Sequence, residues 1–227
     1  MYKNIEVLDK SKHQNVKFDN VTALEVAKNI GVVPIGVDEV LDMSCIAPVL
    51  ISSGDNAEFI SITGISNDAN IYQNESLYKP NFVKSYPFFN ITVKDTNDKL
   101  VRLIAIDQDE RFIGDKKDNS VFTKDNTLEE LAENKIELVR KLDKSREISK
   151  IIVKEFQEKN LLTKKDFRIK IGEEERVVLK EFYVINRDEL LKLDDATLSL
   201  WAKKGWMGII DAHTKSLGNF QNLVPNK

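Results

Sequence analysis

Histidine offers acid–base chemistry because its charge changes near neutral pH. The sequence contains two histidines, His13 and His213. His213 is expected on the apolar face of a C-terminal helix, where it is a candidate catalytic base or ligand contact, with Asp211 and Ser216 nearby. The alternative that we favour is a buried structural histidine that bonds a backbone carbonyl or a carboxylate. His13 lies in a polar segment and is expected to be exposed.

Three acidic residues, Asp107, Asp109 and Glu110, follow the expected end of a strand. Functional residues often lie at such positions, so Asp107 is a second catalytic candidate. A calcium loop of the EF-hand type would need an acidic or amide residue and then glycine where this chain has Arg111 and Phe112. The spacing therefore predicts no metal site, and we expect a solvated loop.

The best candidates for a ligand-binding pocket are aromatic. Tyr78, Tyr86 and Phe88 cluster in the sequence around Pro80 and Pro87. Prolines restrict the chain, and tyrosines place hydroxyl groups on an apolar wall, as small-molecule pockets do. The alternative, which we favour, is aromatic packing of a helix on a sheet.

Cys45 is the single cysteine, so it cannot form an internal disulfide or build a thiolate zinc site alone. We expect a small, buried and inert thiol. The sequence contains no nucleophile elbow, phosphate-binding loop, dinucleotide-binding glycine motif or paired-histidine zinc motif. The sequence therefore gives no support for an ordinary hydrolase, an NTPase, a dinucleotide-binding enzyme or a zinc protease. No cofactor is predicted.

The charge balance argues against a nucleic-acid partner. The 227 residues carry 34 Lys+Arg against 37 Asp+Glu, a formal net charge of -3, with no dense basic block. With 41% hydrophobic residues the chain can bury a core, but no apolar run approaches the roughly 20 residues of a membrane span. The start shows no signal-peptide pattern. A cytoplasmic protein is expected, and arrival at the cell surface by a route without a signal peptide is the alternative.

Short β-rich runs dominate the first half of the chain. Residues 47–52 and 58–65 flank a turn, and residues 88–94 and 100–106 flank another, so antiparallel hairpins are predicted. A helix is expected over residues 21–29.

Helical periodicity begins at Thr127, which with Glu130 matches a capping box, and persists to about residue 160. An unbroken helix here would reach roughly 50 Å, so we expect a break near residues 143–145. The alternative is one long helix that mediates a homodimer through residues 127–160.

A second hairpin follows, with alternating strands on either side of Gly172. Two terminal helices are then predicted, the first from Asp194 or Asp195 and the second from Trp206. Gly205 and Gly218 are expected to end them in the left-handed conformation. Trp201 and Trp206 are expected to pack these helices together.

These elements predict an α+β protein with an N-terminal antiparallel sheet and helices, a helical middle segment, a β-hairpin and two C-terminal helices. One domain, 1–227, is expected. The alternative division is a mainly β part, 1–125, and a mainly α part with one hairpin, 126–227.

Three stretches of the sequence carry motifs of a known family: residues 181–190 (EFYVINRDEL), residues 208–220 (GIIDAHTKSLGNF) and residues 78–88 (YKPNFVKSYPF). They resemble the bacterial SapC family. The resemblance extends over nearly the whole chain, with Asp107 at the position of a family strand end. It departs where the family usually has a tryptophan before the central segment, since this chain has Asn74, Glu75 or Ser76 there.

The resemblance implies association with S-layer gene clusters in bacteria and implies no particular mechanism. We therefore expect a non-enzymatic binding or accessory module for S-layer or cell-surface biogenesis, with a protein or a small ligand as partner. The first alternative is a small-molecule sensor or enzyme with a pocket near Tyr86, Asp107 and His213. The second is a structural surface-layer component.

Overall fold

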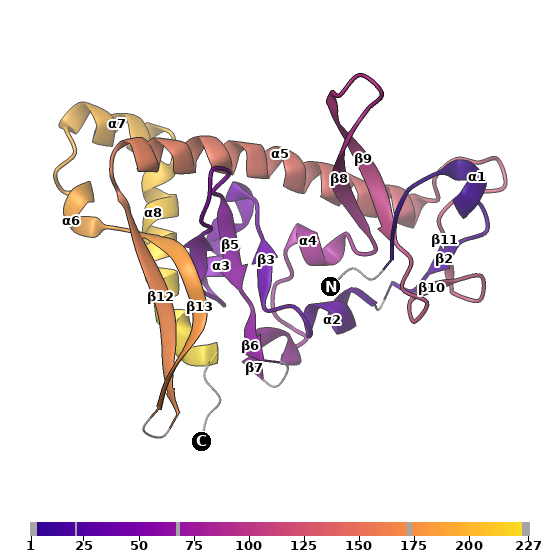
Figure 1. The fold of residues 1–227 in the computed structure, drawn as a ribbon, viewed down its shortest axis with the longest axis horizontal. Helices are drawn as coiled ribbons and strands as arrows, with labels where there is room; N and C mark the ends of the chain where they lie inside the picture. The colour runs from indigo at the N-terminus through magenta and orange to yellow at the C-terminus, as the bar shows by residue number, and fades with distance from the viewer. Residues whose placement is uncertain (1–3, 21, 67–68, 172–173, 224–227) are drawn as a thin grey trace. The chain divides into compact units, whose positions relative to one another are not determined.

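The structure is a computed structural model that describes residues 4–20, 22–66, 69–171 and 174–223 (Figure 1). The chain forms two compact units, each assembled from two stretches. Unit 1 comprises Met1–Ala27 and Lys79–Asp143, and unit 2 comprises Lys28–Tyr78 and Lys144–Lys227. These borders differ from the alternative division after residue 125, and the assignment of the chain to one domain stays a prediction. The predicted α+β class is confirmed.

The predicted hairpin of unit 1 is present. Strands β8 (Phe88–Lys94) and β9 (Leu100–Asp107) pair in antiparallel order, and β1 (Ile5–Val7) pairs with the other edge of β9. Asp95 shapes the turn because its carboxylate accepts the backbone N–H groups of Asn97 and Lys99. The hairpin therefore follows from its turn chemistry and its alternating pattern.

Unit 1 also contains a second small sheet, which the sequence patterns did not predict. Strand β2 (Lys17–Phe18) pairs on its two sides with β10 (Ile113–Gly114) and β11 (Asn119–Ser120). The short helices of this unit are α1 (Lys10–His13), α2 (Thr22–Ala27) and α4 (Asn81–Lys84). The core of unit 1 joins these parts through Phe18, Phe88, Ile106, Val121, Phe122, Ile136 and Val139.

Unit 2 is built on a five-stranded antiparallel sheet in the order β12-β13-β4-β5-β3. The strands are β3 (Val32–Pro34), β4 (Val49–Ile51), β5 (Phe59–Ile62), β12 (Leu162–Ile171) and β13 (Glu174–Ile185). The predicted C-terminal hairpin is thus confirmed, and its strand β13 extends the sheet of β4 and β5. Its connection, residues 172–173, lies outside the described residues. The remaining elements of unit 2 before residue 144 are η1 (Val37–Glu39), α3 (Val40–Ser44), β6 (Gly64–Ser66), β7 (Ala69–Asn70) and η2 (Ile71–Gln73).

Helix α5 (Glu130–Glu158) is continuous over 29 residues, about 43 Å. The predicted break at residues 143–145 is therefore wrong. Polar side chains break a helix when they compete for its backbone, but here Asp143 pairs with Arg102, and Ser145 donates its hydroxyl to Asp38. The predicted capping box is also wrong, because the helix begins at Glu130 and the Thr127 hydroxyl pairs with that of Thr123.

The chain ends in α6 (Arg187–Leu190), α7 (Asp195–Lys203), α8 (Trp206–Ser216) and η3 (Leu217–Leu223). Gly205 has φ 76° between the last two α-helices, as predicted, and Asp194 caps α7 by accepting the N–H of Thr197. Gly218 was predicted to end α8 with a left-handed residue, which is wrong because the chain continues through it into η3. Trp201 and Trp206 contact each other with ring centroids 5.8 Å apart, as predicted.

The sheet of unit 2 is covered by helices, since α8 contacts α3, β13 and β4 (Figure 1). Phe167 of β12 stacks on Phe220 of η3 with centroids 4.1 Å apart. Among the described residues, no helix combines the length and the apolar character that crossing a membrane requires.

Candidate functional site

Two of the predicted site residues, Tyr86 and Asp107, are in direct contact in unit 1. The Tyr86 hydroxyl donates a 2.8 Å hydrogen bond to Oδ2 of Asp107, and the backbone N–H of Asn4 donates to Oδ1 at 3.2 Å. Both side chains are buried, with exposed fractions of 2% and 0%. The expectation of a solvated loop is therefore wrong for Asp107. This residue is the last of β9, and pairing with Ile5 of β1 holds it inside the unit.

Asp109 is buried as well, which again corrects the expectation of a solvated loop. Arg111 binds its carboxylate with two donors, Nε at 3.0 Å from Oδ1 and Nη2 at 2.6 Å from Oδ2. A bidentate pair of this kind fixes both side chains in one plane. The hydrogen bond to Asp109 raises the pKa of Arg111.

Lys135 was not predicted as a functional residue, yet it is the one buried lysine among the described residues. Its Nζ donates to the backbone carbonyls of Lys84 at 2.8 Å and Tyr86 at 2.9 Å. Burial lowers its pKa to about 8. The sequence feature that could have identified Lys135 is its position between Ala132 and Val139, on the buried face of the helix.

Tyr78, the third aromatic candidate, belongs to unit 2. Its hydroxyl donates a 3.1 Å hydrogen bond to Oε1 of Glu39, a buried carboxylate that also accepts the N–H of Gly36. Burial and the charge of Glu39 raise the pKa of Tyr78 and that of the fully buried Tyr72. The Tyr72 hydroxyl has no hydrogen-bond partner among the described residues. This cluster was missed because Glu39 reads as an ordinary solvent-facing residue in the sequence.

Phe88, also proposed as a ligand contact, lies in the core of unit 1 with an exposed fraction of 0%. Its ring packs edge-on against Phe18 at a centroid distance of 5.5 Å. This is the packing role that the sequence favoured.

His213 is fully buried in unit 2, whereas Tyr86 and Asp107 belong to unit 1. Its Nε2 accepts the backbone N–H of Ile185 at 3.1 Å. Burial lowers its pKa to about 4, and the nearby backbone of Val49 opposes that shift. Nδ1 has no hydrogen-bond partner within bonding geometry among the described residues. Because Nε2 is an acceptor, the ring is neutral with its proton on Nδ1, and it joins α8 to β13.

Two further expectations about single residues are wrong. Cys45 was expected to be buried, but it caps the exposed C-terminus of α3, and its thiol faces the carbonyl of Leu41. His13 was expected to be exposed, but it is fully buried at the end of α1, where Nδ1 accepts the N–H of Asp9. In both cases a short helix, invisible in the periodicity, decides the burial.

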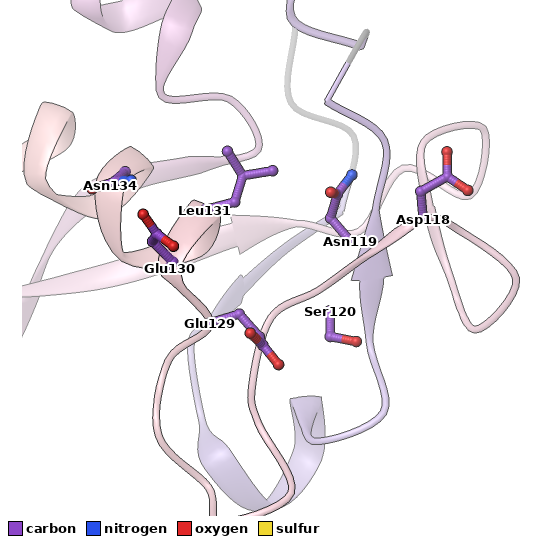
Figure 2. A pocket seen from close by; sticks show the side chains of 7 residues that line it. All are labelled: Asp118, Asn119, Ser120, Glu129, Glu130, Leu131 and Asn134. Carbon is purple, nitrogen blue, oxygen red and sulfur yellow. The ribbon is translucent and has the colours of Figure 1, made fainter.

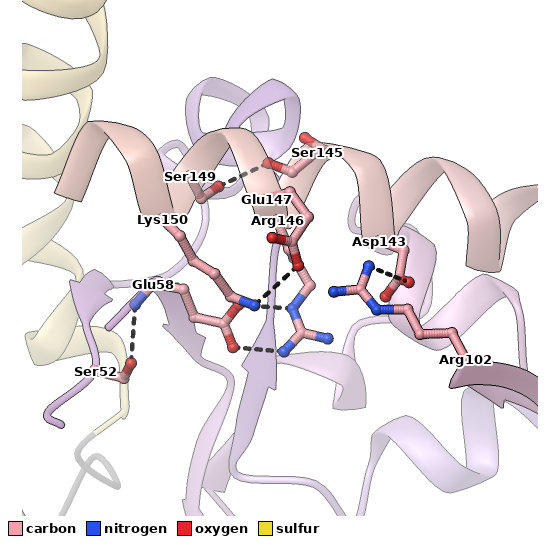
Figure 3. Close-up of polar contacts among 9 residues, drawn as sticks. All are labelled: Ser52, Glu58, Arg102, Asp143, Ser145, Arg146, Glu147, Ser149 and Lys150. Carbon is pink, nitrogen blue, oxygen red and sulfur yellow. Dashed lines mark hydrogen bonds and ion pairs between the residues drawn. The ribbon is translucent and has the colours of Figure 1, made fainter. Parts of the chain in front are cut away.

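Unit 2 carries an open groove of about 630 Å³ between the turn that joins β4 to β5 and the second half of α5. It is lined by Gly54, Asp55, Asn56, Ala57, Glu147, Lys150, Ile151, Lys154, Gln157 and Tyr183. Beside it, Arg146 of α5 binds both carboxylate oxygens of Glu58, with Nε at 2.8 Å from Oε2, and Lys150 pairs with Glu147 at 3.0 Å (Figure 3). The pair of Arg146 and Glu58 joins α5 to the residue that precedes β5, so it fixes this side of the groove.

Unit 1 carries a hollow of about 460 Å³ between β11 and the start of α5. Its lining includes the carboxylates of Asp118, Glu129 and Glu130 (Figure 2). Acidic side chains are stabilised at a helix N-terminus by the helix dipole. That role accounts for Glu129 and Glu130 without a ligand.

Among the described residues no group of three or more His, Cys, Asp or Glu could hold a metal ion. The fold and these sites define an α+β protein in which the candidate acid–base residues Asp107 and His213 are buried and unit 2 carries an open groove.

The SapC family model matches residues 8–223, and the chain belongs to the SapC family. No curated protein and no solved structure matches the chain.

Proposed function

We propose that this SapC-family protein is a non-enzymatic binding or accessory module that holds a partner protein in the groove of unit 2. The main observation that supports this proposal is the groove. Its lining mixes both signs of charge with the apolar side chains of Ile151 and Tyr183, which is typical of a protein contact, whereas small-molecule pockets are more apolar and more enclosed.

The candidate catalytic residues support the same function. Asp107 and His213 have exposed fractions of 0%, and each is held by hydrogen bonds to its own unit. The lowered pKa of His213 leaves it neutral at physiological pH, and its Nε2 lone pair is already used. A general base must reach the proton that it removes, which this burial opposes.

The place of action that we propose is the cytoplasm, in support of S-layer or cell-surface biogenesis. The surface association rests on the family resemblance. A lone, exposed thiol at Cys45 is compatible with a reducing compartment. Fractionation of cells that make the protein tests this, and recovery from the outer surface would favour export or a structural coat role instead.

The groove is tested by capture of partners from such cells. The bait is the full chain, either unchanged or with Asn56→Trp, which places a bulky ring on the exposed rim of the groove. The matched control is Asn97→Trp, on the exposed turn between β8 and β9 in unit 1. We expect the captured proteins to be lost with Asn56→Trp and kept with Asn97→Trp. Equal capture by both variants would contradict the groove as the binding site.

A further inference from the structure

The outer face of α5 in unit 2 carries two exposed isoleucines. Ile151 is 64% exposed and Ile148 is 44% exposed. Ile151 also borders the groove, whereas Ile148 does not line it. Two large apolar side chains exposed three residues apart on one helix form an unpartnered apolar strip.

Charged residues flank these isoleucines in a definite order. Lys144 lies four residues before Ile148, and Glu155 lies four residues after Ile151. The four positions are therefore spaced by four, three and four residues, the spacing of one heptad seam. We call Lys144, Ile148, Ile151 and Glu155 the α5 seam.

The ends of the α5 seam are available for a charge contact. Lys144 is exposed and forms no ion pair with the described residues. Glu155 is half-buried, and its Oε1 accepts a 2.6 Å hydrogen bond from Nε1 of Trp201. Trp201 therefore fixes the orientation of this carboxylate, and Oε2 accepts no hydrogen bond from the part of the chain that the structure describes.

We infer that a second copy of this chain covers the α5 seam, with the two helices antiparallel around a two-fold axis between Ser149 and Lys150. That axis places Ile148 of one copy opposite Ile151 of the other, and Lys144 opposite Glu155. Each contact occurs twice, as an isologous interface requires. A parallel pairing would instead set Lys144 against Lys144 and Glu155 against Glu155, so the order of charges selects the antiparallel arrangement.

The inference goes beyond the proposed function, because the dimer needs no partner protein. Ile151 belongs to both surfaces, so the second copy and a partner in the groove would compete for this side chain. The seam is one short stretch of helix, so the contact is smaller than the interfaces of obligate dimers. The dimer is accordingly weak and forms in a concentration-dependent way.

Sedimentation of the purified full chain over a range up to about 100 μM tests the dimer. We expect Ile148→Glu alone and Ile151→Lys alone to weaken it at least about tenfold, because each places a charge against an apolar side chain. The two substitutions together place opposite charges across the axis, so the double variant should recover most of the affinity. Lys144→Glu should also weaken the dimer, since it opposes Glu155 twice.

The matched control is Lys99→Glu, the same charge change on the exposed turn between β8 and β9 in unit 1. It should leave the dimer intact, and circular dichroism checks that every variant is folded. A wild-type chain that stays monomeric would overturn the inference. So would a dimer insensitive to Ile148→Glu, a double variant that fails to recover, or an equal loss with Lys99→Glu.

Discussion

Tyr86 and Asp107 form a buried hydrogen bond, from the phenol to Oδ2 at 2.8 Å, between the segment that follows α4 and the end of β9. The two residues are distant in sequence, so the bond ties the predicted aromatic segment to the hairpin sheet of unit 1. A buried carboxylate depends on such donors because it has been removed from water.

Tyr86→Phe should therefore destabilise the protein by about 1–3 kcal/mol, since it leaves a buried carboxylate with one donor fewer. Urea unfolding measures the change. Tyr183→Phe is the matched control, because Tyr183 is half-buried and its hydroxyl makes no hydrogen bond with the described residues. Equal stability of Tyr86→Phe and the wild type would show that the bond contributes nothing.

Lys135 should make the stability rise with pH. The folded chain releases the Lys135 proton near pH 8, whereas the unfolded chain holds it to about 10.5. The unfolded state therefore binds more protons between these values, and folding becomes more favourable by about 3 kcal/mol across the window. We expect the difference in free energy of unfolding between wild type and Lys135→Met to grow over this range. Parallel pH curves for the two proteins would exclude the assignment.

His213 should also make the stability of the protein rise with pH, but in the acidic range. The unfolded chain takes up its proton near pH 6.5 and the folded chain only near pH 4, so stability falls as the pH falls between them. The loss that His213 contributes should be about 3 kcal/mol. His213→Gln keeps an acceptor for the N–H of Ile185 and removes the titration. Its stability should change less between pH 6.5 and pH 4, and a loss as large as that of wild type would refute this account.

The pair of Arg146 and Glu58 should stabilise unit 2 through its bidentate geometry. Arg146→Lys replaces two aligned donors by one point charge, so we expect a loss of about 1 kcal/mol in thermal or urea unfolding. Arg140→Lys, at an exposed pair with Glu137 on the same helix, should have little effect. Equal effects of the two substitutions would assign no special role to the partly buried pair of Arg146 and Glu58.

Features encoded by local chemistry were predictable. The hairpin of β8 and β9 follows from alternation and an Asp–Asn turn, and the Gly205 turn follows from a glycine between two helical patterns. The SapC resemblance at residues 78–88 and 181–220 was equally visible, and the family is confirmed.

Features encoded by contacts distant in sequence were not predictable. Asp143 lies inside the continuous helix α5 and pairs with Arg102, and the burial of Asp107 involves Tyr86 and strand β1. His13 and Cys45 were misplaced because short helices set their burial. Lys135 could be found only by asking why a lysine lies on the apolar face of a helix.

Site-specific photo-cross-linking in living cells tests whether the groove of unit 2 binds a partner protein. A photoreactive phenylalanine analogue replaces Gln157, an exposed residue of the groove, or Asn97, the exposed control position in unit 1. We expect a covalent adduct with a partner protein from position 157 and none from position 97. No adduct from position 157, or the same adduct from both positions, would contradict it.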